Sequence, residues 1–96
     1  MLENIAYLEL LRRGYKVFTG KAGEYEVDFT AWRGNDIEHY QVAWTAADSA
    51  VLSRELRPLQ IIRDHNPKFL LTMDPLPSVS HNGIKQINIL DWLLTG

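Results

Sequence analysis

The sequence EYEVDFTAWRGNDIEHYQVAW, residues 24–44, decides the fold of this chain. Apolar and polar residues alternate over residues 24–32, which is the period of two expected for a half-buried strand. Residues 33–36 have the composition of a tight turn, and residues 37–44 form a second strand-like segment. Two antiparallel strands joined by a short turn are therefore predicted. The apolar face of the first strand is expected to hold Tyr25, Val27, Phe29 and Ala31.

Helical and strand-like segments flank this hairpin on both sides. They are a helix at 2–13, a strand at 15–19, a helix at 49–65 capped by Asp48 or Ser49 and kinked or split at Pro58, a strand at 68–73, a loop at 74–83, a strand at 84–90 and a helical turn at 91–94. The order of the main elements is α-β-β-β-α-β-β. A helix between the third and fourth strands permits a parallel pair, whereas the short earlier connections require antiparallel pairing. We expect an α/β fold of mixed, α+β-like character, in which helices flank a central mixed sheet of about five strands.

Length and composition limit the classes of protein to consider. The 96 residues are enough for one domain, 1–96, with one core. The chain has no cysteine, so disulfides, thiolate metal sites and cysteine nucleophiles are excluded. No apolar run approaches the roughly 20 residues that span a bilayer, and no signal peptide begins the sequence, so a cytoplasmic protein without membrane contact is expected.

The charge balance does not favour nucleic-acid binding. The formal net charge is −2, so any such binding would need a local basic patch. Two clusters of basic residues are candidates, and each is more often a solvated surface. They are Arg12, Arg13, Lys16 and Lys21 in the first half, and Arg54, Arg57, Arg63 and Lys68 in the second.

Two polar residues of the hairpin are candidates for a metal site. Asp28 and Gln41 lie nearly opposite each other if the turn is at 33–36. Glu3, on the first helix, is a plausible third oxygen donor. Converging acidic oxygens are what a metal-dependent phosphodiesterase uses to hold Mg²⁺.

Five segments carry a resemblance to a known group of proteins. They are LENIAYLELLRRGY (2–15), EVDF (26–29), YQVAW (40–44), LRPLQIIRDHNPKFLLTMD (56–74) and GIKQINILDWLL (83–94). The pattern resembles the carboxy-terminal domain of unknown function of prokaryotic AAA-type ATPases. That domain is similar to the PD-(D/E)XK, or restriction-endonuclease-like, nuclease superfamily. The resemblance covers essentially the whole chain and implies a restriction-endonuclease-like fold.

The resemblance also implies a site, and this sequence departs from it at two positions. The helix glutamate of the superfamily falls on Glu3, its catalytic aspartate on Asp28, its second acid on Gln41 and its lysine on Ala43. Gln41 removes a charge, and Ala43 offers neither charge nor hydrogen bond. Loss of one transition-state contact costs roughly two to three orders of magnitude in rate.

Three functions follow as hypotheses. The first is a catalytically inactive, nuclease-like accessory or binding domain of an AAA-type ATPase. This chain has no phosphate loop, so it is expected to be a fragment whose ATPase domain lies upstream. The second is an active nuclease that uses Mg²⁺ and a migrated basic residue, that is, one from another position that takes the role of the missing lysine. The candidates are Arg54, Arg57 and Lys68. The third is a structural domain that forms a homodimer through an exposed C-terminal strand and residues 92–94.

The remaining conspicuous side chains have ordinary interpretations. His39, His65 and His81 lack the spacing of a metal cluster and are expected at the surface. Trp32, Trp44 and Trp92 are expected in the core or in an interface.

Overall fold

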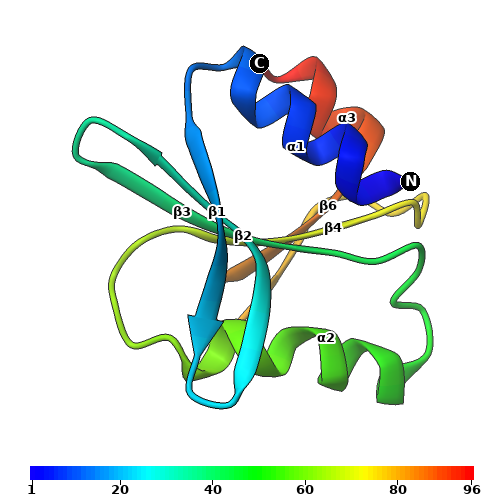
Figure 1. Ribbon diagram of the computed structural model, residues 1–96. Coiled ribbons are helices and arrows are strands. Elements are labelled where there is room, and N and C mark those ends of the chain that lie inside the picture. The colour runs from blue at the N-terminus through cyan, green and yellow to red at the C-terminus, as the bar shows by residue number, and fades with distance from the viewer.

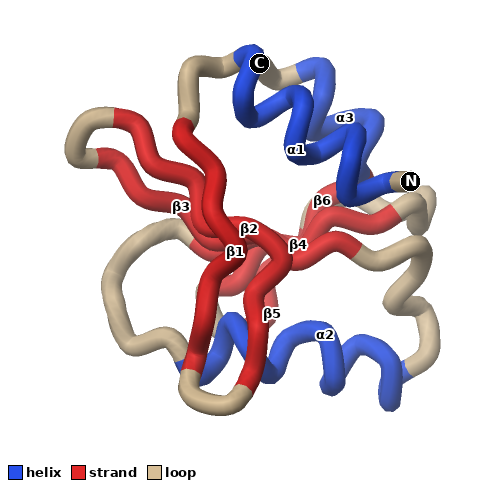
Figure 2. Tube along the Cα trace, viewed as in Figure 1, coloured by secondary structure: helices blue, strands red, loops and turns tan.

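A computed structural model describes all 96 residues as a central sheet between two helical layers (Figure 1). The chain coloured by secondary structure has the strands in the middle, with α1 and α3 on one face of the sheet and α2 on the other face (Figure 2). The elements are α1 (Leu2–Arg12), β1 (Lys16–Ala22), β2 (Tyr25–Arg33), β3 (Asp36–Val42), α2 (Ser49–Ile61), β4 (Lys68–Thr72), β5 (Val79–His81), β6 (Ile84–Asn88) and α3 (Ile89–Leu94). The expected α/β fold class is confirmed.

The sheet is mixed and has the strand order β1-β2-β3-β4-β6-β5. The pairs β1–β2 and β2–β3 are antiparallel, and β3–β4 is parallel across the α2 crossover, as predicted. The sixth strand, β5, lies within the segment predicted as a loop. It pairs with β6 through the turn at Asn82 and Gly83, which both have positive φ, the conformation that a two-residue hairpin turn requires.

A β-bulge in β2 changes which residues share a face. Phe18 pairs with Thr30 and Gly20 with Val27, so one residue of β1 faces two residues of β2, Asp28 and Phe29. Such an extra residue reverses the alternation of side chains. Val27 consequently packs in the core under α2, whereas Phe29 and Ala31 contact the core under α1. The prediction of one apolar face from 25 to 31 was therefore wrong.

The expectation of a single core was wrong, because each face of the sheet carries its own hydrophobic core. The first core joins α1 and α3 to the sheet and contains Leu10, Tyr40 and Trp92. The second joins α2 to the other face and contains Leu56, Leu59 and Leu70. Two helical layers on one twisted sheet let a short chain bury both faces of its central strands.

The second helix is shorter than expected and is not broken at Pro58. It begins after Asp48, whose Oδ1 accepts hydrogen bonds from the Ala50 and Val51 N–H groups at 2.8 and 3.2 Å, as an N-cap residue does. Pro58 lies inside the helix, which ends at Ile61. Asp48 is thus the cap, and the expected extension to residue 65 was wrong.

Two expectations about the C-terminal region and the tryptophans needed correction. The predicted C-terminal edge strand, β6, lies between β4 and β5, and Trp92 is buried in the core. The strand edge and Trp92 therefore cannot contribute to the surface predicted for self-association, whereas Leu94 is 86% exposed. Trp32 and Trp44 are exposed, so only Trp92 has the expected core position. None of the three helices has the length and apolar character that a membrane span requires.

Candidate functional site

The candidate site lies where β2 and β3 separate beside the bulge. The last paired residues of the two strands are Phe29 and Tyr40. Beyond this pair, away from the turn, hydrogen bonds between backbone N–H groups and side-chain oxygens connect the two strands. The Asp28 N–H donates to Gln41 Oε1 at 2.8 Å, and the Val42 N–H donates to Asp28 Oδ2 at 2.8 Å. The two residues therefore lie side by side, as expected from the turn position, and each one satisfies a backbone N–H of the opposite strand.

The orientation of the Gln41 side chain is fixed by these contacts. Its carbonyl oxygen must face the Asp28 N–H, because exchanging oxygen and nitrogen would bring two donors together. The amide nitrogen consequently points to α2, where it lies 3.4 Å from the backbone oxygen and from Oε1 of Glu55. Gln41 is only 6% exposed. A neutral donor thus faces the carboxylate of Glu55.

Glu55 is the residue of this cluster that sequence reasoning missed. It lies on α2 directly before Leu56, and one turn from Leu52 and from Leu59. An acidic residue next to the apolar stripe of a helix is unusual. That position was the signal in the sequence that could have identified it.

Burial sets the electrostatics of the two acids. It raises the pKa of Asp28, against the opposing effect of the Val42 N–H, and the charges of Glu3 and Glu26 raise it further. Burial likewise raises the pKa of Glu55, and the negative charge of Asp28 acts in the same direction. The charge of Arg54 opposes these effects and lowers the pKa of Glu55.

Glu3 stays at the margin of this cluster. Its carboxylate is 55% exposed, and its one hydrogen bond is to the amino group of Met1 at 3.4 Å. Its charge affects the pKa of Asp28 and of Glu55, but it shares no hydrogen bond with Asp28 or Gln41. The structure thus brings together Asp28 and Gln41, adds Glu55, and leaves Glu3 outside.

The position of the expected lysine is apolar. Ala43 packs against the core under α2, and its N–H donates to the Leu71 carbonyl at 3.0 Å. Among the candidate migrated cations, Arg54 and Arg57 line a surface hollow of about 600 Å³ together with Gln41 and Glu55. Neither arginine forms an ion pair within the chain.

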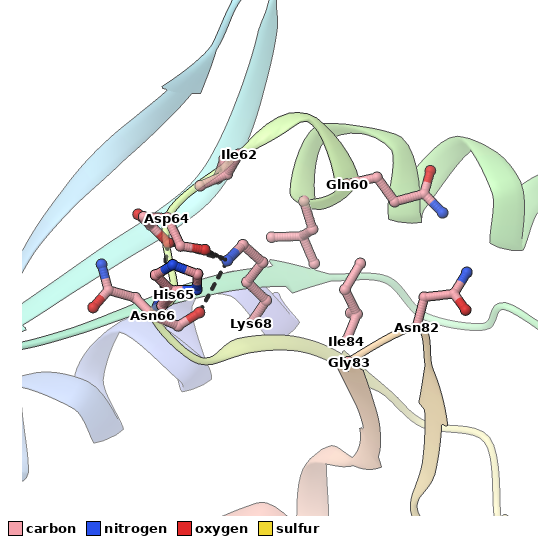
Figure 3. Close-up of a pocket in the computed structure, with 10 residues that line it drawn as sticks. Gln60, Ile62, Asp64, His65, Asn66, Lys68, Asn82, Gly83 and Ile84 are labelled. Carbon is pink, nitrogen blue, oxygen red and sulfur yellow. Dashed lines mark hydrogen bonds and ion pairs between the residues drawn. The ribbon is translucent and has the colours of Figure 1, made fainter.

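Lys68, the third candidate cation, is held elsewhere. Figure 3 shows its amino group bound to Asp64 and Asn66, in a different hollow beyond the end of α2. The distances from Nζ are 3.0 Å to Asp64 Oδ1 and 3.0 Å to the Asn66 carbonyl. Asp64 also lies 2.9 Å from Nε2 of His39. This network uses Lys68 for structure and leaves Arg54 and Arg57 as the cations beside Gln41.

His39 is buried, contrary to the expectation of a surface position. Its Nδ1 lies 3.0 Å from Thr30 Oγ1, so both ring nitrogens have partners. Arg12 and Arg13, from the first basic cluster, are likewise paired, since both bind Glu9. His39 and Arg13 thus have their polar groups held within the chain, whereas Arg12 stays 59% exposed.

The cluster does not fit a bound Mg²⁺. The ion needs several oxygen ligands around it, but the Gln41 group that faces Glu55 is a donor nitrogen. Asp28 Oδ2 and Gln41 Oε1 are both hydrogen-bonded to the backbone. Nowhere in the structure do three or more histidine, cysteine, aspartate or glutamate side chains form an arrangement that could hold a metal.

Comparison with known proteins gives a relative and no family. No family model matches the chain. A protein of Haemophilus influenzae described as an uncharacterized protein is 39% identical over 93 residues, which is 97% of this chain and 22% of that protein. The chain is therefore similar to a segment of a longer protein and spans about a fifth of that relative's length.

Proposed function

We propose that this chain is a catalytically inactive module with a restriction-endonuclease-like fold, which acts as an accessory or binding domain of a longer ATPase. The observation that carries the proposal is the hydrogen-bonded Gln41, whose carbonyl oxygen accepts from the Asp28 N–H and whose amide nitrogen lies against Glu55, at the position where the resemblance expects a second acid. The position of Ala43 supports it, because this residue packs against the core under α2 and offers no charge where the lysine is expected.

A cleavage assay tests the inactivity. The full chain is incubated with Mg²⁺ or Mn²⁺ and single-stranded or double-stranded DNA and RNA, beside an Asp28→Ala/Glu3→Ala variant as control. We expect no cleavage above that of the control. Cleavage by the unaltered chain that the two substitutions abolish would contradict the proposal.

The accessory role rests on the resemblance and on the length of the relative. The Haemophilus influenzae protein has roughly four fifths of its chain outside the matched region, which is room for an ATPase domain. We expect the purified Haemophilus influenzae protein to hydrolyse ATP. If it neither binds nor hydrolyses ATP, the ATPase part of the proposal fails, while the inactivity of the site is tested separately by the cleavage assay.

One observation favours a second candidate, an active nuclease with a migrated cation. Arg54 and Arg57 line the same hollow as Gln41 and Glu55, and neither forms an ion pair. If cleavage is found, this candidate requires that an Arg54→Ala/Arg57→Ala variant lose it. An Arg63→Ala variant, which changes an exposed arginine outside that hollow, serves as the matched control and should retain it.

A further inference from the structure

A third surface hollow lies at the end of the sheet that carries the β2–β3 turn. It has a volume of about 420 Å³ and is lined by Gly14, Lys16, Phe18, Trp32, Arg33 and Gly34. Two aromatic and two basic side chains thus surround it, and no acidic residue lines it. We call it the aromatic hollow. It shares no residue with the hollow beside Gln41, so its chemistry is independent of the cluster at Asp28.

The pairing of β1 with β2 puts both aromatic rings on one face of the sheet. Val17 and Ala31 are paired with each other and contact the core under α1. Side chains alternate along a strand, and paired residues share a face, so Phe18 and Trp32 lie on the opposite face. Lys16 is paired with Trp32 and lies on that face as well. The two aromatic residues are therefore diagonal neighbours on adjacent strands, with Cα atoms about 7–8 Å apart.

The helix α2 does not cover these two rings, although it packs on the same face of the sheet. The core under α2 contains Ala22 and Val27, at the other end of β1 and β2. Figure 1 shows the β2–β3 hairpin projecting to the left beyond the helices. Phe18 and Trp32 remain 54% and 50% exposed. The Trp32 indole N–H donates to the Gly34 carbonyl at 2.6 Å, so the chain orients this exposed ring before any ligand binds.

Both cations of the aromatic hollow lack an acidic partner. Neither Lys16 nor Arg33 forms an ion pair within the chain. Arg33 is oriented by a hydrogen bond of 2.8 Å from Nη1 to the Arg13 carbonyl and by the Tyr15 ring, whose centroid is 4.4 Å from the Arg33 Cζ atom. Asp36, paired with Arg33 across the turn, lines a different hollow. The chain is negative as a whole, but this patch is locally positive and complements an anion.

Exposed rings beside unpaired cations fit one class of ligand. The bases of a single strand have open faces that stack on aromatic side chains, and the phosphates between them bind basic residues. Sheets that recognise single-stranded RNA stack successive bases on aromatic residues in this way. We propose that the aromatic hollow binds single-stranded nucleic acid, with adjacent bases on Trp32 and Phe18 and phosphates at Lys16 and Arg33.

Fluorescence anisotropy with labelled oligothymidylate and oligouridylate tests the proposal on the full chain. Trp32→Ala and Phe18→Ala should each weaken binding roughly five- to a hundredfold, the effect of losing one stacked base. Trp44→Ala, which changes an exposed tryptophan outside the hollow, is the matched control and should leave the affinity unchanged. Circular dichroism should show that the variants are folded, and Trp32→Phe, which keeps an aromatic face, should bind more tightly than Trp32→Ala.

The salt dependence tests the two cations. Because each phosphate neutralised on a single strand contributes about 0.7 to the slope of log Kd against log salt, two cations predict a slope of about 1.4. Lys16→Ala should reduce the slope by about half. Lys21→Ala, an exposed lysine on the same strand but outside the hollow, should leave it unchanged. A duplex of the same length should bind at least tenfold more weakly, because its bases are already stacked.

The three tryptophans also report the surface directly, since each gives one indole N–H signal in a nitrogen–proton correlation spectrum. The signal that Trp32→Phe removes should move when oligonucleotide is added, and that of Trp44 should not. No binding at millimolar protein, equal affinity for the duplex, or binding that Phe18→Ala and Trp32→Ala leave unchanged would overturn the proposal. A Trp32 signal that moves with protein concentration alone would overturn it as well, because a second copy would then cover the rings.

Discussion

Replacing Gln41 by glutamate changes the group that faces Glu55 while keeping the shape of the side chain. In Gln41→Glu, one carboxylate oxygen can still accept the hydrogen bond from the Asp28 N–H. The other oxygen takes the place of the amide nitrogen, 3.4 Å from Glu55 Oε1. A weak hydrogen bond is thereby replaced by a contact between two carboxylates, with Asp28 as a third acid nearby.

The expected loss of stability follows from that distance. Two unit charges 3.4 Å apart repel by roughly 5 kcal/mol at an effective dielectric constant of about 20. Glu55 is partly exposed, so solvent screening should reduce the effect to about 1–3 kcal/mol. Each kcal/mol corresponds to about 4–8 °C in the melting temperature of a domain of this size. The introduced carboxyl should have a raised pKa, because burial and the neighbouring acids disfavour its charged form.

The pH dependence distinguishes this mechanism from a packing defect. An acid whose pKa is raised by folding binds its proton more tightly in the folded state, so stability falls as the pH rises. The variant should therefore match the unaltered chain near pH 4 and be less stable at pH 8. Mn²⁺ should restore part of the loss, because the substitution supplies the oxygen that a metal needs.

Urea unfolding followed by tryptophan fluorescence, at pH 4 and pH 8 and with or without Mn²⁺, measures these effects. Gln86→Glu is the matched control, because Gln86 is a buried strand glutamine whose partner is His81 at 2.8 Å. It should also lose stability between pH 4 and pH 8, because burial raises the pKa of any buried carboxyl, but Mn²⁺ should restore none of that loss, since no second acid faces it. Equal loss at both pH values for Gln41→Glu, or no loss at all, would refute the reasoning about the acidic cluster.

Substitutions at three positions test other parts of the account by the same unfolding measurement. Asp28→Ala should lower the free energy of unfolding by about 1–3 kcal/mol, because the Val42 N–H loses its acceptor. Asp28→Asn should be at least as stable as the unaltered chain at pH 8. A similar loss of stability in both variants would count against a stabilising role of this hydrogen bond. Asp74→Ala removes the acceptor of the buried Ala46 N–H and should cost about 1–3 kcal/mol at neutral pH. The hydroxyl of Thr45 and the Ala46 N–H lower the pKa of Asp74. The stability that Asp74 contributes is therefore present above its unfolded pKa of about 3.9 and is lost as the pH falls through the lower folded pKa. If Asp74→Ala costs as much stability at low pH as at neutral pH, this explanation is contradicted. Gly20→Ala would place a methyl group against the Thr30 hydroxyl and should cost about 1–3 kcal/mol of stability by overpacking. An unchanged urea midpoint would show that β1 and β2 can move apart at the bulge without loss of stability.

Periodicity predicted most elements of the fold, because each core element has a regular apolar pattern. The hairpin at 24–44 and the parallel pair across α2 followed from alternation and connection length. The strand β5 was missed because it has only three residues and follows two prolines. The bulge at Asp28 could not be predicted, since it depends on how β1 pairs with β2.

The candidate site was predictable only in part, for a similar reason. Asp28 and Gln41 could be paired by counting from the turn, since the register of a hairpin follows from its loop. The contact of Gln41 with Glu55 depends on how α2 packs across the sheet, which is a tertiary property. The burial of His39 likewise depends on Asp64, 25 residues away.

The most direct test of the central claim is a titration of the unaltered chain with Mn²⁺, followed by electron paramagnetic resonance of the free ion. If the Gln41 amide occupies the metal position, the account predicts no saturable binding that depends on Asp28. Gln41→Glu should create such binding, and Asp28→Asn in that background should remove it. Saturable Mn²⁺ binding by the unaltered chain that Asp28→Asn abolishes would contradict the account.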